Sequence, residues 1–297
     1  MEGKISSSLL SDNLIENTEY SFTSKDLSFI SDIMKNDTGI VLSEAKASLV
    51  YSRLAKRLRK LGLSGFSDYC ALVTTAEGAE ERKEMMAALT TNVTSFFREP
   101  HHFEHMRTKI LPDLVRRAKA GERIRMWSAA CSSGPEPYSI ALTLLQLMPD
   151  ANHYDIRILA TDIDENILAV ASAGIYEESL LTPVSAELRH NWLRPLENDQ
   201  DRYQVREELR RLISFKPLNL IGTWPMKGKF QVIFCRNVVI YFDHHTQEQL
   251  WTRFAPILDE GGALYVGHSE RISGTAASSL RSDGITVYRK FSTGVMK

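Results

Sequence analysis

Apolar residues recur at helical spacing in the N-terminal third of the chain. A first helix is expected to begin after Thr23, because Thr23 and Asp26 have capping-box spacing and an apolar helical pattern follows. Three more helical stretches are expected, with breaks at residues 36–39, at Gly62 and at residues 74–78. We therefore predict a helical domain over residues 21–90, preceded by a flexible tail, residues 1–20, that is rich in Ser and Asn.

The helix expected between residues 43 and 61 has two distinct faces. Its apolar stripe, which we expect to be buried, consists of Val50, Leu54, Leu58 and Leu61. Its basic stripe, on another face, consists of Arg53, Lys56, Arg57 and Lys60. Gly62 is placed to end the helix, because glycine adopts the left-handed conformation of a helix C-cap without steric cost.

After residue 122 the pattern changes to strands that alternate with helices. Strands are expected at residues 123–129, 155–161, 213–218, 229–235, 263–267 and 285–290. Helices are expected at residues 138–148 and 246–258, and another follows the second strand and runs through residue 173. Such alternation is typical of a mostly parallel sheet with helices on both faces. Residues 174–211 are polar and interrupt the alternation, which indicates an inserted subdomain. We thus expect a linker and connecting helix at residues 91–122 and an α/β domain at residues 123–297.

Composition and charge narrow the class of protein. The 297 residues include 36 Lys and Arg against 37 Asp and Glu, whereas dedicated nucleic-acid binders usually have a clear cationic excess. No uncharged apolar run approaches the roughly 18 residues that span a bilayer, and the first residues do not resemble a secretory signal. Cys70, Cys131 and Cys235 lie far apart, which argues against zinc clusters and disulfide frameworks. The sequence predicts a cytoplasmic globular protein that neither binds nucleic acid nor inserts into a membrane.

The ends of the first two predicted strands carry candidate ligand-binding residues. The turn at residues 130–137 has small residues where backbone N–H groups converge, although a plain strand–helix turn is an equally good interpretation. Its single glycine, Gly134, does not make a dinucleotide fingerprint. Asp162 is placed to accept the ribose hydroxyls of a nucleoside, while Asp164 is expected to cap the following helix.

Two further segments combine polar and aromatic side chains. Arg236 and Asn237 directly follow a buried strand, and Tyr241 lies beyond a short apolar run, where a buried hydroxyl needs a partner. Residues 90–99 run from polar through aromatic to basic, and taken alone they read as a linker with a hydrophobic anchor.

The histidines near residue 100 are weaker candidates. His101 and His105 have the spacing of a zinc-binding helix, but the H-E-x-x-H pattern fails because residue 102 is His. A solvated helix start after Pro100 is the preferred interpretation, and we predict no metal site.

Five motifs in order resemble the chemotaxis receptor methyltransferases of the CheR type. They are residues 91–99 (TNVTSFFRE), 127–139 (WSAACSSGPEPYS), 161–164 (TDID), 235–242 (CRNVVIYF) and 267–270 (GHSE). Each is weak alone, but all five together are highly specific, and the resemblance spans roughly residues 23–290.

The resemblance implies a class I S-adenosylmethionine methyltransferase domain, Rossmann-like with a mostly parallel sheet, an N-terminal all-α domain and a small inserted β-subdomain. The implied reaction is methyl transfer from S-adenosyl-L-methionine to glutamate side chains on chemoreceptor cytoplasmic helices, in chemotaxis adaptation. Its products are glutamyl methyl esters and S-adenosyl-L-homocysteine. The implied partner is the cytoplasmic domain of a methyl-accepting chemotaxis protein, and we expect the enzyme to be a monomer.

Roles for single residues also follow from the resemblance. Arg98 and Tyr241 match residues beside the reaction centre. Cofactor contacts are implied for Asn92, Thr94, Arg98, Glu136, Asp162, Asn219, Leu220, Arg236 and Asn237. Pro135 stands where the family usually has Glu, and because proline suits the first turn of a helix we expect the turn to survive with one negative charge fewer.

The basic stripe gains a function under this resemblance. Receptor methylation helices are rich in glutamate, so a cationic helix face is suited to dock them, the alternative being a merely solvated face. Two other functions stay open: a class I methyltransferase of another acceptor, and a non-catalytic module that keeps the cofactor fold and binds a partner. An NAD-dependent dehydrogenase is disfavoured by the missing glycines.

Overall fold

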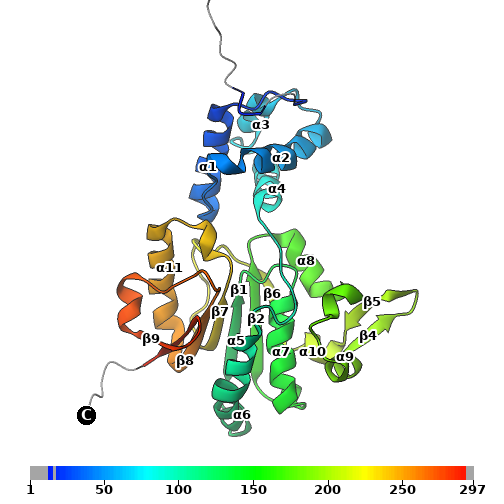
Figure 1. Cartoon of the computed structure of the whole chain (residues 1–297), viewed down its shortest axis with the longest axis vertical. Helices are drawn as coiled ribbons and strands as arrows, with labels where there is room; N and C mark the ends of the chain where they lie inside the picture. The colour runs from blue at the N-terminus through cyan, green and yellow to red at the C-terminus, as the bar shows by residue number, and fades with distance from the viewer. Residues whose placement is uncertain (1–12, 16–17, 292–297) are drawn as a thin grey trace, which may run out of the picture. The chain divides into compact units, whose positions relative to one another are not determined.

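The computed structural model describes residues 13–15 and 18–291, which belong to two units, Met1–Thr90 and Thr91–Lys297 (Figure 1). Most of the tail expected over residues 1–20 lies outside the described residues. Among the described helices, none combines the length and the apolar character needed to cross a membrane.

The first unit is built of helices that begin and end at signals in the sequence. They are α1 (Ser24–Thr38), α2 (Ala47–Leu61), α3 (Phe66–Leu72) and α4 (Ala79–Leu89). Thr23 and Asp26 exchange hydrogen bonds at the start of α1, each side chain accepting from the other residue's backbone N–H, as in a capping box. Gly62 ends α2 with a φ of 67°, in the left-handed region that glycine tolerates.

The apolar stripe of α2 forms part of the core of this unit. Val50, Leu54 and Leu58 are fully buried, and each such side chain stabilises the fold by roughly 1.5–3 kcal/mol. Leu61, the last residue of the helix, is 39% exposed. The prediction that Leu61 is buried is therefore wrong, because the packed part of the stripe ends one turn earlier.

The second unit is built on a seven-stranded sheet in the order β6-β2-β1-β7-β8-β10-β9. Its strands are β1 (Ile124–Ala129), β2 (Ile156–Asp162), β6 (Ile213–Pro217), β7 (Phe230–Cys235), β8 (Leu258–Val266), β9 (Leu280–Gly284) and β10 (Val287–Lys290). The pairings of β6, β2, β1, β7 and β8 are parallel, and only those of β10 are antiparallel. The mostly parallel sheet expected from the sequence is confirmed.

Helices pack against both faces of this sheet. They include α5 (Pro100–His105), α6 (Leu111–Lys119), α7 (Pro135–Leu147), α8 (Glu165–Ala173) and α11 (His244–Ile257) (Figure 1). Trp127 of β1 lies 5.2 Å from Phe254 of α11, measured between ring centroids. Its neighbour Met126 belongs to the same buried cluster as Leu114 of α6 and Leu142 of α7. Since successive side chains of a strand point to opposite faces, each face of β1 is covered by helices.

A second, smaller sheet lies in the segment between α8 and β6. This three-stranded antiparallel sheet has the order β3-β5-β4. The elements are β3 (Ile175–Glu177), α9 (Ala186–Trp192), β4 (Leu193–Leu196), β5 (Asp199–Val205) and α10 (Glu207–Arg210) (Figure 1). Tyr176 and Val205 tie this sheet to the main core, because both belong to its buried cluster.

Candidate cofactor site

The candidate site lies at the carboxyl edge of the parallel strands. β1 pairs with β2 on one side and with β7 on the other, so the segments that follow these three strands meet at one edge. In open α/β sheets this edge, at the point where the strand order reverses, is where ligands bind. The segments are residues 130–134, 163–164 and 236–241.

The turn between β1 and α7 is tightly wound. Ala130, Ser132 and Gly134 have φ values of 67°, 52° and 97°, and the first two are non-glycine residues in the left-handed region, where such residues are uncommon. A Cβ on Gly134 would lie 2.7 Å from the Tyr176 hydroxyl and 3.0 Å from Ala171 Cβ. Gly134 is thus required by packing against the protein itself. α7 begins at Pro135, three residues before the predicted start at residue 138, and the turn tolerates proline as expected.

Asp162, at the end of β2, presents a buried carboxylate at this edge. One oxygen accepts the Ser132 N–H at 2.8 Å and the other accepts the Asp164 N–H at 3.1 Å. Burial raises the pKa of Asp162, although these backbone hydrogen bonds act to lower it. Because a carboxylate offers about four acceptor positions, Asp162 keeps the capacity to accept hydroxyl groups of a ligand.

Asp164 has the capping role that the sequence predicted. Its carboxylate accepts from the backbone N–H groups of Asn166 and Ile167 at the start of α8. The same carboxylate accepts the Nδ2 amide of Asn92 at 3.1 Å. Asn92 is therefore held at the β2 end of the site.

Arg236 occupies the centre of the site and is almost completely buried. Its guanidinium lies 3.1 Å from a Glu136 carboxylate oxygen and 3.4 Å from one of Glu99, and it donates to the carbonyl of Arg98. The side chain is 2% exposed, so its contacts are with the protein. The ion pair with Arg236 thus orients the Glu136 carboxylate at this edge.

Glu136 lies in the first turn of α7, facing the same edge. One carboxylate oxygen accepts the Ser128 hydroxyl at 2.6 Å and the other accepts from Arg236 at 3.1 Å. Burial raises the pKa of Glu136, and Arg236 and Ser128 partly oppose that rise. The result is an oriented carboxylate suited to bind an ammonium group.

The residues expected at the reaction centre lie in the flanking loops. Arg98 is half-buried and donates to the Val93 carbonyl at 3.0 Å. Thr94, in the same loop, is half-buried. Tyr241, also half-buried, ends a short 3-10 turn, Val239–Tyr241, that follows β7. Asn237 has a φ of 58° and donates from its side chain to Glu99 at 3.3 Å.

Asn219 and Leu220 lie in the loop after β6. The Asn219 side chain accepts the Ile221 N–H at 3.1 Å. Two residues that sequence reasoning missed, Trp224 and Arg253, hold the loop by donating to the Leu220 carbonyl at 3.1 and 2.7 Å. Arg253 also lies 3.9 Å over the Trp224 ring. No sequence signal marked Arg253, because its contacts join α11 to a distant loop.

The basic stripe of α2, in the first unit, is only partly available to a partner. Arg53 donates to the carbonyls of Ala88 and Thr90 at 3.0 and 2.5 Å. Arg57 is 14% exposed and forms ion pairs with Glu81 and Glu84. These two arginines hold α2 against α4. Lys56 and Lys60 are exposed.

The histidines that follow Glu99 do not form a solvated helix start, and that expectation is wrong. His102 is fully buried, and burial lowers its pKa to about 3. Its Nε2 lies 2.8 Å from the Thr286 hydroxyl, which itself donates to the Ile285 carbonyl, so His102 is the donor to Thr286. The α5 helix does begin at Pro100, as expected.

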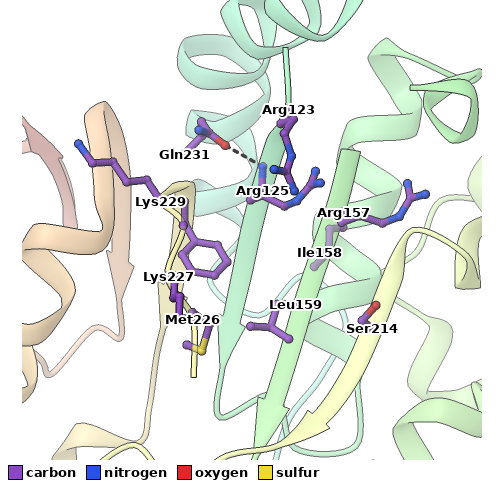
Figure 2. A pocket seen from close by; sticks show the side chains of 12 residues that line it. Arg123, Arg125, Arg157, Ile158, Leu159, Ser214, Met226, Lys227, Lys229 and Gln231 are labelled. Atoms are coloured by element: carbon purple, nitrogen blue, oxygen red, sulfur yellow. Dashed lines mark hydrogen bonds between the residues drawn. The ribbon is translucent and has the colours of Figure 1, made fainter. Parts of the chain in front are cut away.

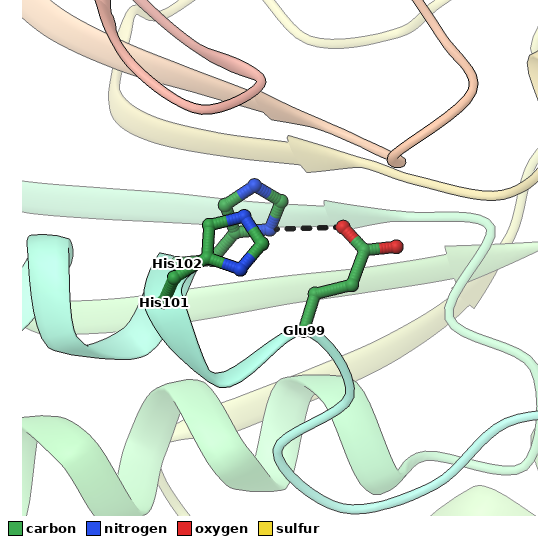
Figure 3. Close-up of side chains that lie close together, drawn as sticks. All are labelled: Glu99, His101 and His102. Atoms are coloured by element: carbon green, nitrogen blue, oxygen red, sulfur yellow. Dashed lines mark ion pairs between the residues drawn. The ribbon is translucent and has the colours of Figure 1, made fainter.

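One group of side chains has the spacing of metal ligands. Atoms of Glu99, His101 and His102 lie within 4.8 Å of one another, and His102 Nδ1 is 3.6 Å from the Glu99 carboxylate (Figure 3). The same carboxylate oxygen lies 3.4 Å from the Arg236 guanidinium. Arg236 thus already supplies a positive partner, and we assign the group a packing role.

A separate hollow of about 500 Å³ lies at the amino ends of β1, β2 and β7 (Figure 2). Its rim is cationic and includes Arg123, Arg125, Arg157, Lys227 and Lys229. Asp155 pairs with Arg125 at 2.6 Å and with Arg123 at 3.3 Å. The hollow lies at the edge of the sheet opposite the candidate cofactor site, and none of that site's residues line it.

Comparison with known proteins identifies the family. The family described as "CheR methyltransferase, SAM binding domain" matches residues 92–288, and "CheR methyltransferase, all-alpha domain" matches residues 25–90. A probable chemotaxis protein methyltransferase of Rhizobium etli is 57% identical over 261 residues, which cover 88% of this chain and 97% of that protein. Chemotaxis protein methyltransferase 2 of Pseudomonas aeruginosa is 41% identical, with coverage of 92% and 95%. The Escherichia coli chemotaxis protein methyltransferase is 42% identical, with coverage of 82% and 83%. The chain therefore belongs to the CheR methyltransferase family and is an S-adenosylmethionine-dependent methyltransferase that yields S-adenosylhomocysteine.

Proposed function

We propose that this enzyme methylates glutamate side chains on the cytoplasmic helices of chemoreceptors, giving glutamyl methyl esters. The proposal rests on the family membership together with one structural observation. Two oriented carboxylates lie on the segments that follow adjacent parallel strands: Glu136 in the first turn of the helix after β1, and Asp162 at the end of β2. Glu136 would bind the ammonium of the methionine part of the cofactor, and Asp162 the ribose hydroxyls.

The remaining cofactor contacts are proposed for the loops around these carboxylates. Asn92 and Thr94 lie in the loop before α5, and Asn237 follows β7. Asn219 and Leu220 would flank the adenine, in the loop that Arg253 and Trp224 hold. Arg236 would contribute to cofactor binding, as the resemblance implies, and would also orient Glu136.

A carboxylate acceptor simplifies what the protein must do. The glutamate side chain is ionised near neutral pH, so no residue has to remove a proton from it. When bound, S-adenosylmethionine supplies an electrophilic methyl group. The residues of this chain then have to align the carboxylate with that methyl and exclude water, and alignment alone can contribute several kcal/mol to lowering the barrier.

Arg98 and Tyr241 are the residues we propose for this alignment. A guanidinium and a phenol can both donate to a carboxylate oxygen. Arg98 already donates to the Val93 carbonyl, which leaves part of its donor fork for an acceptor. Arg98 and Tyr241 should bind the incoming carboxylate only weakly, because tight binding of the ground state would not speed the reaction.

We propose that Lys56 and Lys60 form the part of the basic stripe that meets the glutamate-rich receptor helix. Arg53 and Arg57 would support them by holding α2 in place. We further propose that the enzyme acts as a cytoplasmic monomer, a state that sedimentation velocity would test directly.

The test of the proposed function is transfer of labelled methyl from S-adenosylmethionine to a purified chemoreceptor cytoplasmic fragment. Glutamyl methyl esters release volatile methanol in alkali, so the expected result is alkali-labile label on the fragment. Binding of S-adenosylhomocysteine without any transfer to receptors would show that the acceptor is a different molecule.

A further inference from the structure

The GHSE motif at residues 267–270 has no role in the site described so far. Its last residue, Glu270, follows β8 and is 4% exposed. A buried carboxylate is costly unless hydrogen bonds satisfy it, so the partners of Glu270 indicate what it is for.

Those partners are backbone N–H groups of the loop that follows β7. One carboxylate oxygen accepts from Val238, Val239 and Ile240 at 3.0, 2.9 and 3.4 Å. The other accepts from Asn237 at 3.1 Å and from Gly267. A single side chain thus binds four consecutive N–H groups of residues 237–240 and ties them to the end of β8.

This loop carries two of the proposed site residues. Asn237 opens it in the left-handed conformation, with a φ of 58°, which is uncommon for residues other than glycine. Tyr241 closes it in a short 3-10 turn, where its N–H donates to the Val238 carbonyl. The backbone N–H groups at the start of such a turn have few acceptors within the turn, and the Glu270 carboxylate serves as their acceptor.

Gly267 explains the first position of the motif. A Cβ on Gly267 would lie 2.8 Å from the Asn237 backbone nitrogen and 2.9 Å from a Glu270 carboxylate oxygen. Both distances are too short for real contacts. The glycine therefore lets the end of β8 approach the loop closely enough for Glu270 to reach its amides.

We propose that Glu270 is a positioning residue for methyl transfer, which sets Asn237 toward the cofactor and Tyr241 toward the acceptor carboxylate. This inference rests on the proposed roles of Asn237 and Tyr241. Because the Glu270 carboxylate is buried against backbone N–H groups, its effect on the reaction would pass through the loop that it holds.

The discriminating variant is Glu270→Gln, which preserves shape and replaces one acceptor oxygen by an NH₂ group. That group would face backbone N–H donors, so at least two of the five hydrogen bonds are lost. Displacement of a reacting group by about 1 Å can cost on the order of 10²-fold in rate. We expect kcat per folded molecule to fall by about that factor, with a smaller increase in the S-adenosylhomocysteine Kd. Ser269→Ala, at an exposed neighbour, is the matched control and should stay within about twofold.

A double-mutant cycle with Tyr241→Phe separates positioning from general loss of stability. If Glu270 acts through Tyr241, Glu270→Gln should lower kcat much less in the Tyr241→Phe background than in the wild type. Independent, multiplicative effects of the two substitutions on kcat would overturn the inference. So would a Glu270→Gln enzyme with reduced stability but wild-type kcat per folded molecule.

Two further measurements keep the result interpretable. If Glu270→Gln does not fold, Glu270→Asp, which keeps both acceptor oxygens on a shorter stem, should retain more kcat than Glu270→Ala; equal kcat in the two would contradict the inference. Failure of the proposed function would appear differently, as a wild-type enzyme without transfer to the receptor fragment, or as Asn237→Ala binding S-adenosylhomocysteine like the wild type.

Discussion

Arg236 has two carboxylates as neighbours and almost no contact with solvent, a combination that sets the character of the site at the scale of single residues. Removing one partner of a buried ion pair typically costs 3–5 kcal/mol, since it leaves an uncompensated charge. Loss of Arg236 would therefore leave Glu99 and Glu136 buried without a cation, and loss of both glutamates would leave Arg236 buried without an anion. The same low-dielectric surroundings that raise the pKa of Glu136 also strengthen its attraction for a ligand cation.

Cofactor binding should weaken as the pH falls, and it should begin to do so at a higher pH than the one at which an ordinary carboxylate becomes protonated. Burial raises the pKa of Asp162, and only its ionised form is a pure acceptor for hydroxyl groups. A raised pKa means that the folded state binds the proton more tightly than the unfolded state, so protonation of this group does not oppose folding. We expect the S-adenosylhomocysteine Kd to rise as the pH falls while it is still above the ordinary Asp pKa of about 3.9, and calorimetry measures this.

The control for this pH dependence is Asp162→Asn, which cannot ionise. It should bind S-adenosylhomocysteine weakly, with a flatter pH profile than the wild type. A wild-type affinity that stays constant down to pH values near the ordinary Asp pKa of about 3.9 would contradict the assignment of Asp162.

Sequence reasoning located side chains by the strand they follow, which is why Asp162, Arg236 and Asn237 were found at one edge. It did not reveal which side chains pair across strands. The contacts of Arg236 with Glu99 and Glu136 join residues 137 and 100 positions apart, and no local pattern records such pairs. Glu270 was found only as part of a motif, and its role depends on the loop that it meets in space.

At the scale of elements, local chemistry decided where helices begin and end. The capping box at Thr23 and the left-handed Gly62 are short-range features, and the helices follow them. β9 was missed because its residues, LRSDG, neither alternate nor favour strands, and it forms by pairing with β10 at the sheet edge. The burial of His102 was missed for a similar reason, since its partner Thr286 lies 184 residues away.

Arg57 should matter for the stability of the helical unit. It is 14% exposed, pairs with Glu81, which is 8% exposed, and the Tyr69 hydroxyl donates to the same Glu81. Arg57→Ala should lower the free energy of unfolding by about 3 kcal/mol, because Glu81 is left buried without its cation. Urea unfolding followed by circular dichroism measures this.

Lys56→Ala is the matched control, one position away on the exposed part of the basic stripe. It should change the free energy of unfolding by no more than about 0.5 kcal/mol. Equal effects of the two substitutions would show that the Arg57 pairs contribute nothing to stability.

At the scale of the whole molecule, the near-neutral total of 36 basic and 37 acidic residues means that any electrostatic docking must come from local patches. The exposed lysines of α2 are the patch proposed here. The double variant Lys56→Glu/Lys60→Glu should raise the apparent KM for a receptor fragment on the order of tenfold, an effect that added salt diminishes. Its Kd for S-adenosylhomocysteine should match that of the wild type.

Lys25→Glu makes the same kind of charge change at an exposed position of α1 and is the control for this docking surface. It should leave the receptor KM unchanged. If the double variant also has a wild-type KM, the basic stripe is a solvated helix face and the receptor binds elsewhere.

The most direct test of the account measures methyl transfer and cofactor-product binding on the same three proteins: wild type, Asp162→Asn and the exposed control Asp150→Asn. We predict that the wild type and Asp150→Asn place alkali-labile methyl groups on glutamates of a chemoreceptor fragment, located by mass spectrometry, and bind S-adenosylhomocysteine equally well. Asp162→Asn should bind S-adenosylhomocysteine only weakly and transfer little methyl while remaining folded. Full product binding and full transfer by Asp162→Asn would contradict the proposed cofactor site, and a methyl group found on any side chain other than glutamate would contradict the proposed reaction.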